Sequence, residues 1–557
     1  MTRPPLFSTV ALAAILLIGT PLFVRTPVWV DVTYHDLIAW NVLHGGVHYR
    51  DVFETNLPGM VWLHCLVRSV VGWSFEAFRL VDLAVIGSAM LLLTRPMKSA
   101  GLSVAGRVWF LAAVALFYLF ETEFIHCQRD GWMLLPAALA TVSRVKRLVK
   151  ASDLPAIPAS RTVVAGVLEG LAWGCAVWIK PHALVPALAV WAVSLRFLPR
   201  GTRRVDFLGL LAGGLMAGAA GCAWLILSGT WPHLWDVLLN WNGEYYSWSA
   251  ADVVKKVRYV PGYFAPFSLL HFVAVPIGSM AICRRGPARA PAALLAALYL
   301  GWLAQATFFQ KPFDYSNAPP TLLGLAVVAI HRWPVGPVFL AWCVVAGLLG
   351  ELAPDHEAIR TFKEAFPTTG RIALPRHPIA QRERLRHWGR CWYDDSPELK
   401  DRLTFYHDAH CAPDWADLGR VADYLKTLDL HDRDLICWHD STHPLYVTLG
   451  IKPGLRYPHV ITAMKFRSKL DEIRRETFAS PAKYVVSDLI PVGYSVAFGP
   501  PPPPGPTDKL PPEFPAWGAD TYPWNQPVVF RAGRYFVHQI TNPRGKIDFP
   551  WPAELKD

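Results

Sequence analysis

A series of long apolar runs, separated by short polar loops, constrains this chain more than any other feature. A transmembrane helix needs about 20 mostly apolar residues. The candidate spans cover residues 6–24, 76–94, 108–124, 131–143, 162–179, 182–198, 206–228, 261–282, 290–309, 317–331 and 335–350. Only 17% of the residues are charged, whereas soluble domains carry about 25%. The sequence therefore predicts an α-helical polytopic membrane protein.

The first apolar run, residues 6–24, follows Arg3 and begins as a signal peptide would. No small-x-small cleavage pattern comes after it, and many further spans do. We therefore expect this run to remain in the protein as the first transmembrane helix.

The distribution of positive charge indicates how the chain threads the membrane. The stretch from Pro58 to Trp73 is apolar but short, and it contains His64 and Arg68. If this stretch lies at the membrane surface, one set of loops becomes strongly basic. These loops hold Arg95, Lys98 and Arg107; Arg144, Lys146, Arg147, Lys150 and Arg161; Arg200, Arg203 and Arg204; Arg284, Arg285 and Arg289; and Arg332. Loops rich in Arg and Lys stay in the cytoplasm, which gives about eleven spans, a cytoplasmic N-terminus and an extracytoplasmic C-terminus. A twelfth span at 58–73 would place the later basic loops on the wrong side.

The same loops account for much of the net charge of +11. A basic chain can bind nucleic acid, but here the excess charge follows the pattern that membrane topology requires. We therefore expect membrane lipid and no nucleic acid among the partners.

The sequence changes character after residue 350, where charge and proline content rise and no run of span length remains. Residues 414–430 have helical periodicity with an Asp near the start. Residues 433–439 and 482–489 resemble buried strands, and 526–540 predicts a hairpin that turns at Gly533. Helices alternating with strands indicate a small α/β domain.

The predicted organisation is therefore a transmembrane domain over residues 1–350, with a first outer loop at about 25–75, and an extracytoplasmic α/β domain over residues 351–557. Within the second domain the proline-rich stretch 499–506 predicts a polyproline-II loop or spacer. A role of this stretch in docking a partner is the alternative.

Nine cysteines show no paired C-x-x-C spacing, so a structural zinc site is not expected. Five of them lie in or beside apolar runs, where thiols act as packing residues: Cys65, Cys175, Cys222, Cys283 and Cys343. Cys391 and Cys411 would lie in an oxidising compartment in this topology, where they are candidates for a disulfide.

Titratable side chains gather at the outer ends of the predicted spans. They occur in four segments: Asp31, His35 and Asp36 after the first span; "ETEFIHCQRDG", which contains Arg129 and Asp130; "WIKPH", which contains Lys180; and "FFQKPFDYSN", which contains Gln310, Lys311 and Tyr315. Ionisable residues at membrane depth are costly and mark functional sites. The topology brings these four segments to one membrane face, and this convergence favours a functional site.

Each residue alone also fits a simpler role. Arg129 and Lys180 fit interfacial anchors, Tyr315 fits an aromatic belt, and Asp130 fits a helix N-cap. Three further acids and one histidine have structural explanations: Asp36 lies on a different helix face from Asp31 and suits a solvated or capping position, His126 suits a satisfied interfacial histidine, and Asp82 and Glu169 suit hydrogen bonds to other helices.

Acids beside cations at the outer membrane face suit one kind of chemistry. Lysine and arginine bind phosphate, and a neighbouring carboxylate can remove a proton from an attacking hydroxyl. Because ATP and nucleotide sugars are absent outside the cytoplasmic membrane, a lipid phosphate is the activated donor that this arrangement favours.

The stretch "DVTYHDLIAWNVLHGGVHYRDVFETNLPGMVWLHCLVRSVVGWSFEAFRLVD" resembles the first outer loop of bacterial GT-C membrane glycosyltransferases, in particular the Rgt-like branch, which is related to protein O-mannosyltransferases and lipid A aminoarabinose transferase. The family pattern of Asp-Glu, Tyr-His, G-x-x-Y-x-D and P-P/G before an interfacial helix is matched at Asp31, Tyr34, His35, Gly46, Tyr49, Asp51, Pro58 and Gly59, with Arg79 later. This chain has Val32 in place of the family's Glu.

Three further motifs extend the resemblance over about residues 7–350. "QRDGWMLLP" is similar to the acidic site that opens the fourth span, "WIKPHAL" to the Lys-Pro site, and "FFQKPFDYSNAPP" to the late outer motif. They match the family at Arg129, Asp130, Lys180, Gln310, Lys311, Tyr315 and Pro319. In the late motif Ser316 replaces the family's His.

The resemblance implies a GT-C fold and inverting transfer from a polyprenyl-phosphate sugar to an acceptor hydroxyl at the outer leaflet. Its implied site comprises Asp31 as general base; Arg129, Lys180 and Lys311 on the donor phosphate; Asp130 orienting the acceptor or a cation; and His35, Gln310 and Tyr315 in substrate binding. Some relatives bind a divalent metal, which Asp31 and Asp130 would share here. The acceptor is a lipid, a glycan or a protein, and the location is the bacterial cytoplasmic membrane.

Two alternatives from other classes remain. A transporter or flippase for a lipid-linked or anionic substrate would place its site near the membrane midplane, often with internal repeats, whereas here no repeat is found and the polar residues lie at span ends. A non-catalytic sensor would use the C-terminal domain for binding.

Overall fold

The computed structural model describes residues 6–153, 159–245, 313–352, 381–404, 411–489 and 519–541, together with residues 510 and 514 and most of 253–311. Within 253–311 the undescribed positions are 255–256, 258–259, 261–263, 265–266, 285 and 287–288. The predicted polyproline stretch 499–506 lies outside the described residues.

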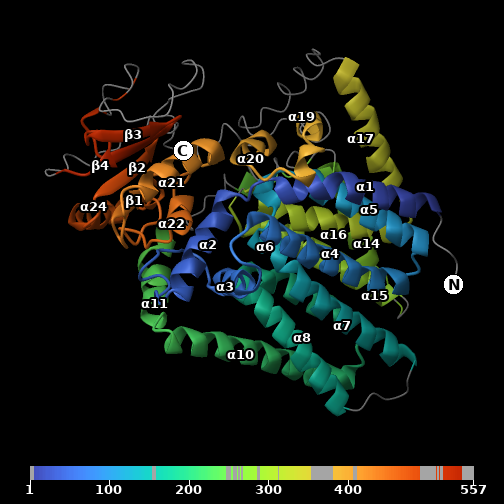
Figure 1. The fold of residues 1–557 in the computed structure, drawn as a ribbon. Coiled ribbons are helices and arrows are strands. Elements are labelled where there is room, and N and C mark those ends of the chain that lie inside the picture. Colours follow the sequence, from blue (N-terminus) through green and yellow to red (C-terminus); the bar gives the residue numbers. More distant parts are fainter. Residues whose placement is uncertain are drawn as a thin grey trace.

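A bundle of apolar helices forms the larger part of the molecule (Figure 1). Each predicted span coincides wholly or in part with one of its helices: α1 (Leu6–Arg25), α4 (Phe75–Ser99), α5 (Val104–Phe120), α7 (Leu134–Asp153), α8 (Ala159–Ile179), α9 (Leu184–Ser194), α10 (Arg203–Leu227), α14 (His271–Cys283), α15 (Ala290–Phe308), α16 (Ala318–Ile330) and α17 (Val335–Leu352). Within the described residues, five helical segments are long and apolar enough to cross a membrane. The prediction of a polytopic helical protein is confirmed.

Several predicted span boundaries are shifted, and two of these shifts lie next to the predicted site. The third span ends at Phe120 rather than at residue 124, because Glu121 leaves the helix and Glu123–Ile125 forms a separate 3-10 turn, η1. The fourth begins at Leu134 rather than at residue 131, after the short helix α6 (Arg129–Trp132). The intervening segment therefore consists of two short helical turns, η1 and α6, and α6 carries Arg129 and Asp130 at one end of the bundle.

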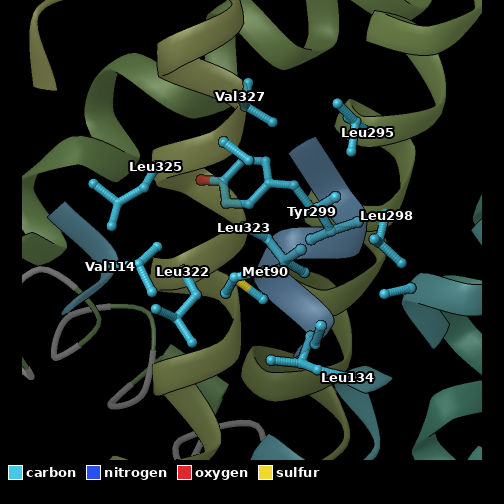
Figure 2. Close-up of a cluster of buried hydrophobic side chains, with 14 of the residues drawn as sticks. Met90, Val114, Leu134, Leu295, Leu298, Tyr299, Leu322, Leu323, Leu325 and Val327 are labelled. Atoms are coloured by element: carbon cyan, nitrogen blue, oxygen red, sulfur yellow. The ribbon is translucent and has the colours of Figure 1, made fainter. Parts of the chain in front are cut away.

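The core of the bundle is made where α4, α5, α7, α15 and α16 meet. Figure 2 shows Met90, Val114, Leu134 and Tyr299 among the leucines and valines of α15 and α16. All of α16 is buried. Lipid tails are as apolar as leucine, so within a bilayer such a core holds the helices together through close van der Waals packing rather than through removal of apolar surface from water.

The helices α8 and α10 approach each other closely along rows of small residues. An added Cβ at Gly170 would lie 2.1 Å from the Leu210 carbonyl oxygen, and one at Gly213 would lie 2.0 Å from that of Val167. Only glycine fits at these positions, as in the small-xxx-small pairs of transmembrane helices. The other side of α10 is exposed and apolar, for example at Leu215 and Leu227, and suits contact with lipid.

A buried charge cluster joins α7, α8, α9 and α10. Arg144 contacts Glu169 at 2.5 Å, Asp206 at 3.0 Å and the Ser194 hydroxyl at 2.7 Å. Arg147 also pairs with Glu169 and Asp206. The expectation that Glu169 bonds another helix is confirmed. The same holds for Asp82, which accepts hydrogen bonds from Tyr118 and Trp132.

Two short helices, α2 (Val30–Leu43) and α3 (Gly59–Val71), lie between the bundle and the C-terminal sheet (Figure 1). Asp36 of α2 joins them, because its carboxylate accepts from His64 Nδ1 at 2.8 Å and from Arg68 Nε at 2.7 Å. Asp36 is 3% exposed. The prediction of a solvated or capping Asp36 is therefore wrong, because α3 covers this carboxylate and supplies both of its partners.

The C-terminal part contains a four-stranded mixed sheet in the order β1-β2-β4-β3. The strands are β1 (Leu435–Cys437), β2 (Tyr484–Asp488), β3 (Val528–Ala532) and β4 (Tyr535–Gln539); the first pair is parallel and the other pairs are antiparallel. Gly533 has φ +52° and makes the hairpin turn. Helix α21 (Trp415–Lys426) begins at Asp414, which accepts a hydrogen bond from the Asp417 amide. The predicted strands, hairpin and helix are confirmed.

Several shorter elements complete the described chain. They are η2 (Pro181–Ala183), η3 (Arg200–Thr202), α11 (Trp231–Asn240), α12 (Asn242–Tyr245), η5 (Phe267–Leu270), η7 (Asp314–Asn317), α19 (Gln381–Arg386), η8 (Arg390–Trp392), α20 (Pro397–Leu403), α22 (Pro444–Leu449), α23 (Val460–Ala463), η9 (Arg467–Lys469) and α24 (Leu470–Ala479). We call residues 411–489 and 519–541 the sheet layer.

The sheet layer shares its hydrophobic core with the first outer loop. Leu37, Ile38 and Val52 pack in one cluster with residues of β1, β2 and β4. Phe53 belongs to a second cluster with Trp438 and other sheet-layer residues, and its backbone amide donates to the Arg456 carbonyl at 2.7 Å. The outer loop is therefore held between the bundle and the sheet layer.

No disulfide joins the nine cysteines, all of which lie among the described residues. Cys391 packs with Leu22, Leu399 and Leu403, whereas Cys411 packs in a separate cluster beside Ala412. The hypothesised disulfide between Cys391 and Cys411 is not formed, because each thiol is held in its own apolar environment.

Candidate functional site

Asp31 lies in the first turn of α2, where the chain leaves the bundle. Its side chain is partly buried, and among the described residues its carboxylate has no hydrogen-bond partner and no ion-pair partner. Burial raises the pKa of the Asp31 carboxyl to about 6. The negative charges of Glu54 and Asp440 also raise this pKa, and the positive charges of Arg129 and Lys180 lower it. Asp31 therefore changes charge near neutral pH.

Glu54 is a second acid at this position, and the sequence analysis gave it no role. It is 2% exposed, and burial raises the pKa of its carboxyl while the charge of Arg129 opposes the shift. Its Oε1 accepts from the backbone amides of Thr55 at 2.8 Å and Asn56 at 2.9 Å. Its Oε2 has no hydrogen-bond partner among the described residues and lies 3.7 Å from His35 Nε2.

The family-like residues before Glu54 build the loop that carries it. Asp51 Oδ2 accepts from the Val47 amide at 2.7 Å. The Tyr49 hydroxyl donates to the Asn56 carbonyl at 2.6 Å. The G-x-x-Y-x-D pattern thus folds the loop back on itself and aims Glu54 at α2. That pattern, with an acid following it, is the signal that would have identified Glu54.

His35 lies on α2 one turn after Asp31. It is 5% exposed, and burial together with the charges of His64 and Arg129 holds its pKa well below the ordinary value. The ring is therefore neutral at physiological pH and acts as a hydrogen-bonding group near Glu54 rather than as a cation.

Three of the predicted binding residues form one buried network. Lys180, in the loop after α8, donates to Asp130 Oδ2 at 2.6 Å and to Gln310 Oε1. Gln310 Nε2 donates to Asp130 Oδ1 at 2.9 Å. The Lys180 ammonium also lies 5.5 Å from the centre of the Tyr315 ring. Three segments distant in sequence therefore meet at Lys180, with Tyr315 beside it.

This network explains the state of Lys180. Burial lowers the pKa of its ammonium to about 8, with the charge of Asp130 opposing the shift. A lysine carries three N–H donors, and the two bonds above use two of them. The third donor remains for an anionic ligand, while the charge of the ammonium is paired with Asp130. Lys180 is 7% exposed, so an anchor at the lipid interface is not its role.

Arg129 opens α6, next to Asp130 of the network. Its charge acts on Asp31, His35, Glu54 and Lys180, and its side chain is partly buried. Its charge therefore acts on both halves of the site, and the charge of Lys180 also reaches Asp31.

Lys311 is a further predicted cation of the site. It is partly buried, and burial lowers the pKa of its ammonium to about 8, with the charge of Lys465 from the sheet layer acting in the same direction. The repulsion between these lysines defines a positive edge of the site next to the sheet layer.

The neighbouring histidine His126 has a structural role. It is 1% exposed, and its ring nitrogens contact the Tyr118 carbonyl at 2.6 Å and Arg79 at 3.0 Å. Arg79 also donates to the Pro27 carbonyl at 2.5 Å. The expectation of a satisfied histidine is confirmed, and Arg79 fixes the chain just before α2.

A divalent metal shared by Asp31 and Asp130 does not fit these residues. Both oxygens of Asp130 accept hydrogen bonds, one from Lys180 and one from Gln310, and an ion would displace these donors. Within the described residues no group of three or more His, Cys, Asp or Glu side chains is placed to hold a metal. The chemistry derived below uses none.

Comparison of the sequence with protein-family models gives no match, and comparison with curated proteins gives none either. Comparison of the fold with solved structures does. The chain is similar to ArnT from Cupriavidus metallidurans bound to undecaprenyl phosphate, with a TM-score of 0.51 and 15% sequence identity over 97% of this chain and 99% of that protein. The apo state of the same ArnT gives a TM-score of 0.50 with the same identity and coverage.

An oligosaccharyltransferase from Archaeoglobus fulgidus matches with a TM-score of 0.45 and 11% identity, over 87% of this chain and 70% of that protein. At such identities the ArnT structures define the fold. This chain has the GT-C fold of ArnT, with a polytopic helical part and a C-terminal part that contains a small sheet. The fold implied by the outer-loop resemblance is therefore confirmed.

Proposed function

We propose that this protein is an integral-membrane glycosyltransferase that moves a sugar from a polyprenyl-phosphate donor to an acceptor hydroxyl, with Asp31 as the general base. The observation that carries the proposal is the state of Asp31. It is an acid with a pKa near 6 and no partner of its own among the described residues, beside the cations Arg129 and Lys180. A structural carboxylate would be paired, as Asp36 is.

The cations suit the donor. A polyprenyl phosphate carries its charge at the membrane surface, and Arg129 and Lys180 offer the charge and the N–H donors that bind phosphate. The ArnT structure of the same fold contains undecaprenyl phosphate, which supports a donor of this class here. Lys311 extends the positive surface towards the sheet layer, and Gln310 and Tyr315 fix the position of Lys180.

The proposed reaction is a single displacement. The acceptor O–H transfers its proton to the Asp31 carboxylate as the acceptor oxygen attacks the anomeric carbon, and the bond from that carbon to the phosphate oxygen breaks. The attack comes from the face opposite the leaving group, so the configuration inverts. The polyprenyl phosphate leaves with additional negative charge, which Arg129 and Lys180 offset.

The pKa values suit these two roles near neutral pH. Asp31, with its pKa raised to about 6 by burial, is ionised at pH 7 yet basic enough to accept a proton. Lys180, with its pKa lowered to about 8, is still charged. Asp130 holds Lys180 in place and orients the acceptor only through it.

The positive-inside distribution supports a bacterial cytoplasmic membrane location with the N-terminus inside. The site would then open to the outer face, where the C-terminal part also lies. Lipids, glycans and proteins all offer hydroxyls there, and each is an acceptor of the class that we propose.

The substitution Asp31→Asn tests the base. We expect transfer to fall by about a hundredfold or more, because loss of a general base costs 10²–10⁴ in rate, while undecaprenyl phosphate still binds. Purified variant and wild-type protein would be compared with a panel of polyprenyl-phosphate sugars. Near-normal turnover by a folded Asp31→Asn variant would contradict the proposal.

A transporter or flippase is the alternative from another class. The polar residues here lie at helix ends and in loops rather than on broken helices at mid-membrane, where transporter sites form. Reconstituted vesicles separate the two proposals, because a transporter moves labelled lipid-linked substrate across the bilayer without forming a glycosylated product.

A further inference from the structure

We propose that Asp440, in the turn after strand β1, is a positioning residue of the reaction centre, so that the sheet layer supplies part of the site around Asp31. The proposal deepens the proposed function and rests on it. Asp440 belongs to the segment 438–443 ("WHDSTH"), which leaves the carboxyl end of β1 and leads into α22. The sequence analysis assigned this turn no role.

The turn is docked on the first turn of α2. His443, which is fully buried, contacts the Thr33 hydroxyl through Nε2 at 2.9 Å. Burial lowers the pKa of His443 to about 3, and the backbone carbonyls of Asp440 and Val30 oppose this shift because they lie next to the ring. His443 therefore connects the backbone at Asp440 to the residues on either side of Asp31.

The turn is also fixed from within the sheet layer. The Ser441 hydroxyl donates to Asp488 Oδ2 at 2.5 Å, and the Asp488 amide donates to His439 Nδ1 at 2.8 Å. Asp488 in turn pairs with Arg534 at 3.3 Å. Residues on both sides of Asp440 are thus held by β2 and the β3–β4 hairpin, and its position relative to α2 follows from the fold.

Charge explains why an acid at this position matters. The groups that face Asp31 are Arg129 from α6, Lys180 from the loop after α8, Glu54 from the first outer loop and Asp440 from the sheet layer. The two cations favour the ionised form of Asp31, and the two acids disfavour it. A carboxyl between two cations alone would be a weaker base. Asp440 offsets part of the effect of the two cations and keeps the Asp31 carboxyl basic enough to accept a proton at neutral pH.

Binding of undecaprenyl phosphate to the full-length protein in detergent tests this role without knowledge of the sugar. Ionised Asp31 repels the phosphate, so affinity falls as pH rises through the pKa of Asp31. The phosphate titrates in the same range, with a second pKa near 6, and the Asp31→Asn variant gives the contribution of the phosphate and of the remaining site groups, such as Lys180. The difference between the wild-type and Asp31→Asn binding profiles reports the titration of the Asp31 carboxyl. In the Asp440→Asn variant we expect the midpoint of the Asp31 titration to move to lower pH by about half a unit to one unit.

Two further variants separate this role from a structural one. Asp440→Glu retains the charge and should restore the wild-type midpoint. Asp423→Asn removes an acid that is 76% exposed on the same layer and should leave the midpoint unchanged. A wild-type midpoint in folded Asp440→Asn would overturn the inference while leaving the proposed function intact. Absence of binding to wild-type protein at every pH would instead contradict the proposed donor, and with it both proposals.

Discussion

Asp31 and Asp36 lie on the same helix, α2, but their surroundings give their carboxyls different properties. Burial alone would raise the pKa of Asp36, but the hydrogen bond from His64 and the charge of Arg68 outweigh it and hold this pKa below the ordinary value. Asp31 has no such partner among the described residues, and burial raises its pKa to about 6. One acid therefore stabilises the fold, and the other is available for chemistry.

This contrast predicts opposite effects on stability for the same substitution. Because the folded-state pKa of Asp31 is raised above its ordinary value of 3.8, the fold disfavours its ionised form. Its contribution to stability is complete below the unfolded pKa and is lost as pH rises through about 6. At about pH 8, Asp31→Asn should therefore raise the thermal unfolding midpoint relative to wild type, and at about pH 4 it should change the midpoint little.

Asp36→Asn is the matched comparison on α2. It leaves Arg68 without its carboxylate in a site where the Arg68 side chain is fully buried, and such a loss costs about 3–5 kcal/mol. The unfolding midpoint should fall, and fall most above the depressed pKa of Asp36, where the wild-type ion pair is complete. Equal destabilisation by the two variants at pH 8 would mean that Asp31 also has a structural partner.

The site residues divide according to whether local sequence could predict them. Asp31, Asp130 and Lys180 interrupt apolar runs at span ends, and charge in such places is visible in the sequence. In the sequence, Glu54 and Asp440 have polar neighbours, so an acid at either position does not stand out. Their approach to Asp31 depends on the loop that Tyr49 closes and on the docking of the sheet layer, and tertiary contacts of this kind have no local signature.

At the scale of elements, the pairing of α8 with α10 determines where Lys180 lies. Lys180 directly follows α8, and Trp178, near the end of that helix, donates from its indole nitrogen to the Ala217 carbonyl of α10 at 2.9 Å. The close contact of the two helices therefore fixes the end of α8 and the position of the ammonium in the site.

Two neighbouring glycines on α10 provide a test of this contact. A Cβ at Gly213 would lie 2.0 Å from the Val167 carbonyl oxygen, whereas one at Gly214 would meet nothing within 4 Å. Gly213→Ala must push the helices apart, and we expect a lower unfolding midpoint and weaker binding of undecaprenyl phosphate. Gly214→Ala should be neutral or stabilising by up to about 1 kcal/mol, because alanine has the higher helix propensity. Equal behaviour of the two variants would contradict this packing.

Helix boundaries were harder to predict than the helices themselves. Hydropathy locates an apolar run, but it does not distinguish a helix from irregular backbone that other segments cover. Residues 121–128 read as the end of a span and the start of the next loop, yet they form η1 and a buried connection at one end of the bundle. Their hydrogen bonds are completed by residues distant in sequence, such as Arg79.

At the scale of the whole molecule, the first outer loop has the bundle on one side and the sheet layer on the other. In Figure 1 α2 and α3 lie between these two parts. The sequence indicates a boundary near residue 350 because composition changes there, and composition says nothing about contact across it. The shared clusters of Leu37 and Phe53 with sheet-layer residues imply that the geometry of Asp31 depends on both parts.

Two leucines on α2 test whether the sheet layer supports the site. Leu37 is fully buried in the cluster shared with the sheet, and Leu43 is 44% exposed on the same helix. Leu37→Ala should cost about 2–5 kcal/mol, as for other buried leucines, and should weaken binding of undecaprenyl phosphate because the first turn of α2 loses its support. Leu43→Ala should change both quantities little. Thermal unfolding and the binding assay would be measured on the same preparations.

If Leu37→Ala lowered stability but left the pH midpoint of binding at its wild-type value, the sheet layer would contribute to folding without setting the charge state of Asp31. A shift of that midpoint to the value seen in Asp440→Asn would mean that the docking of the sheet layer and the tuning of the base are one structural property.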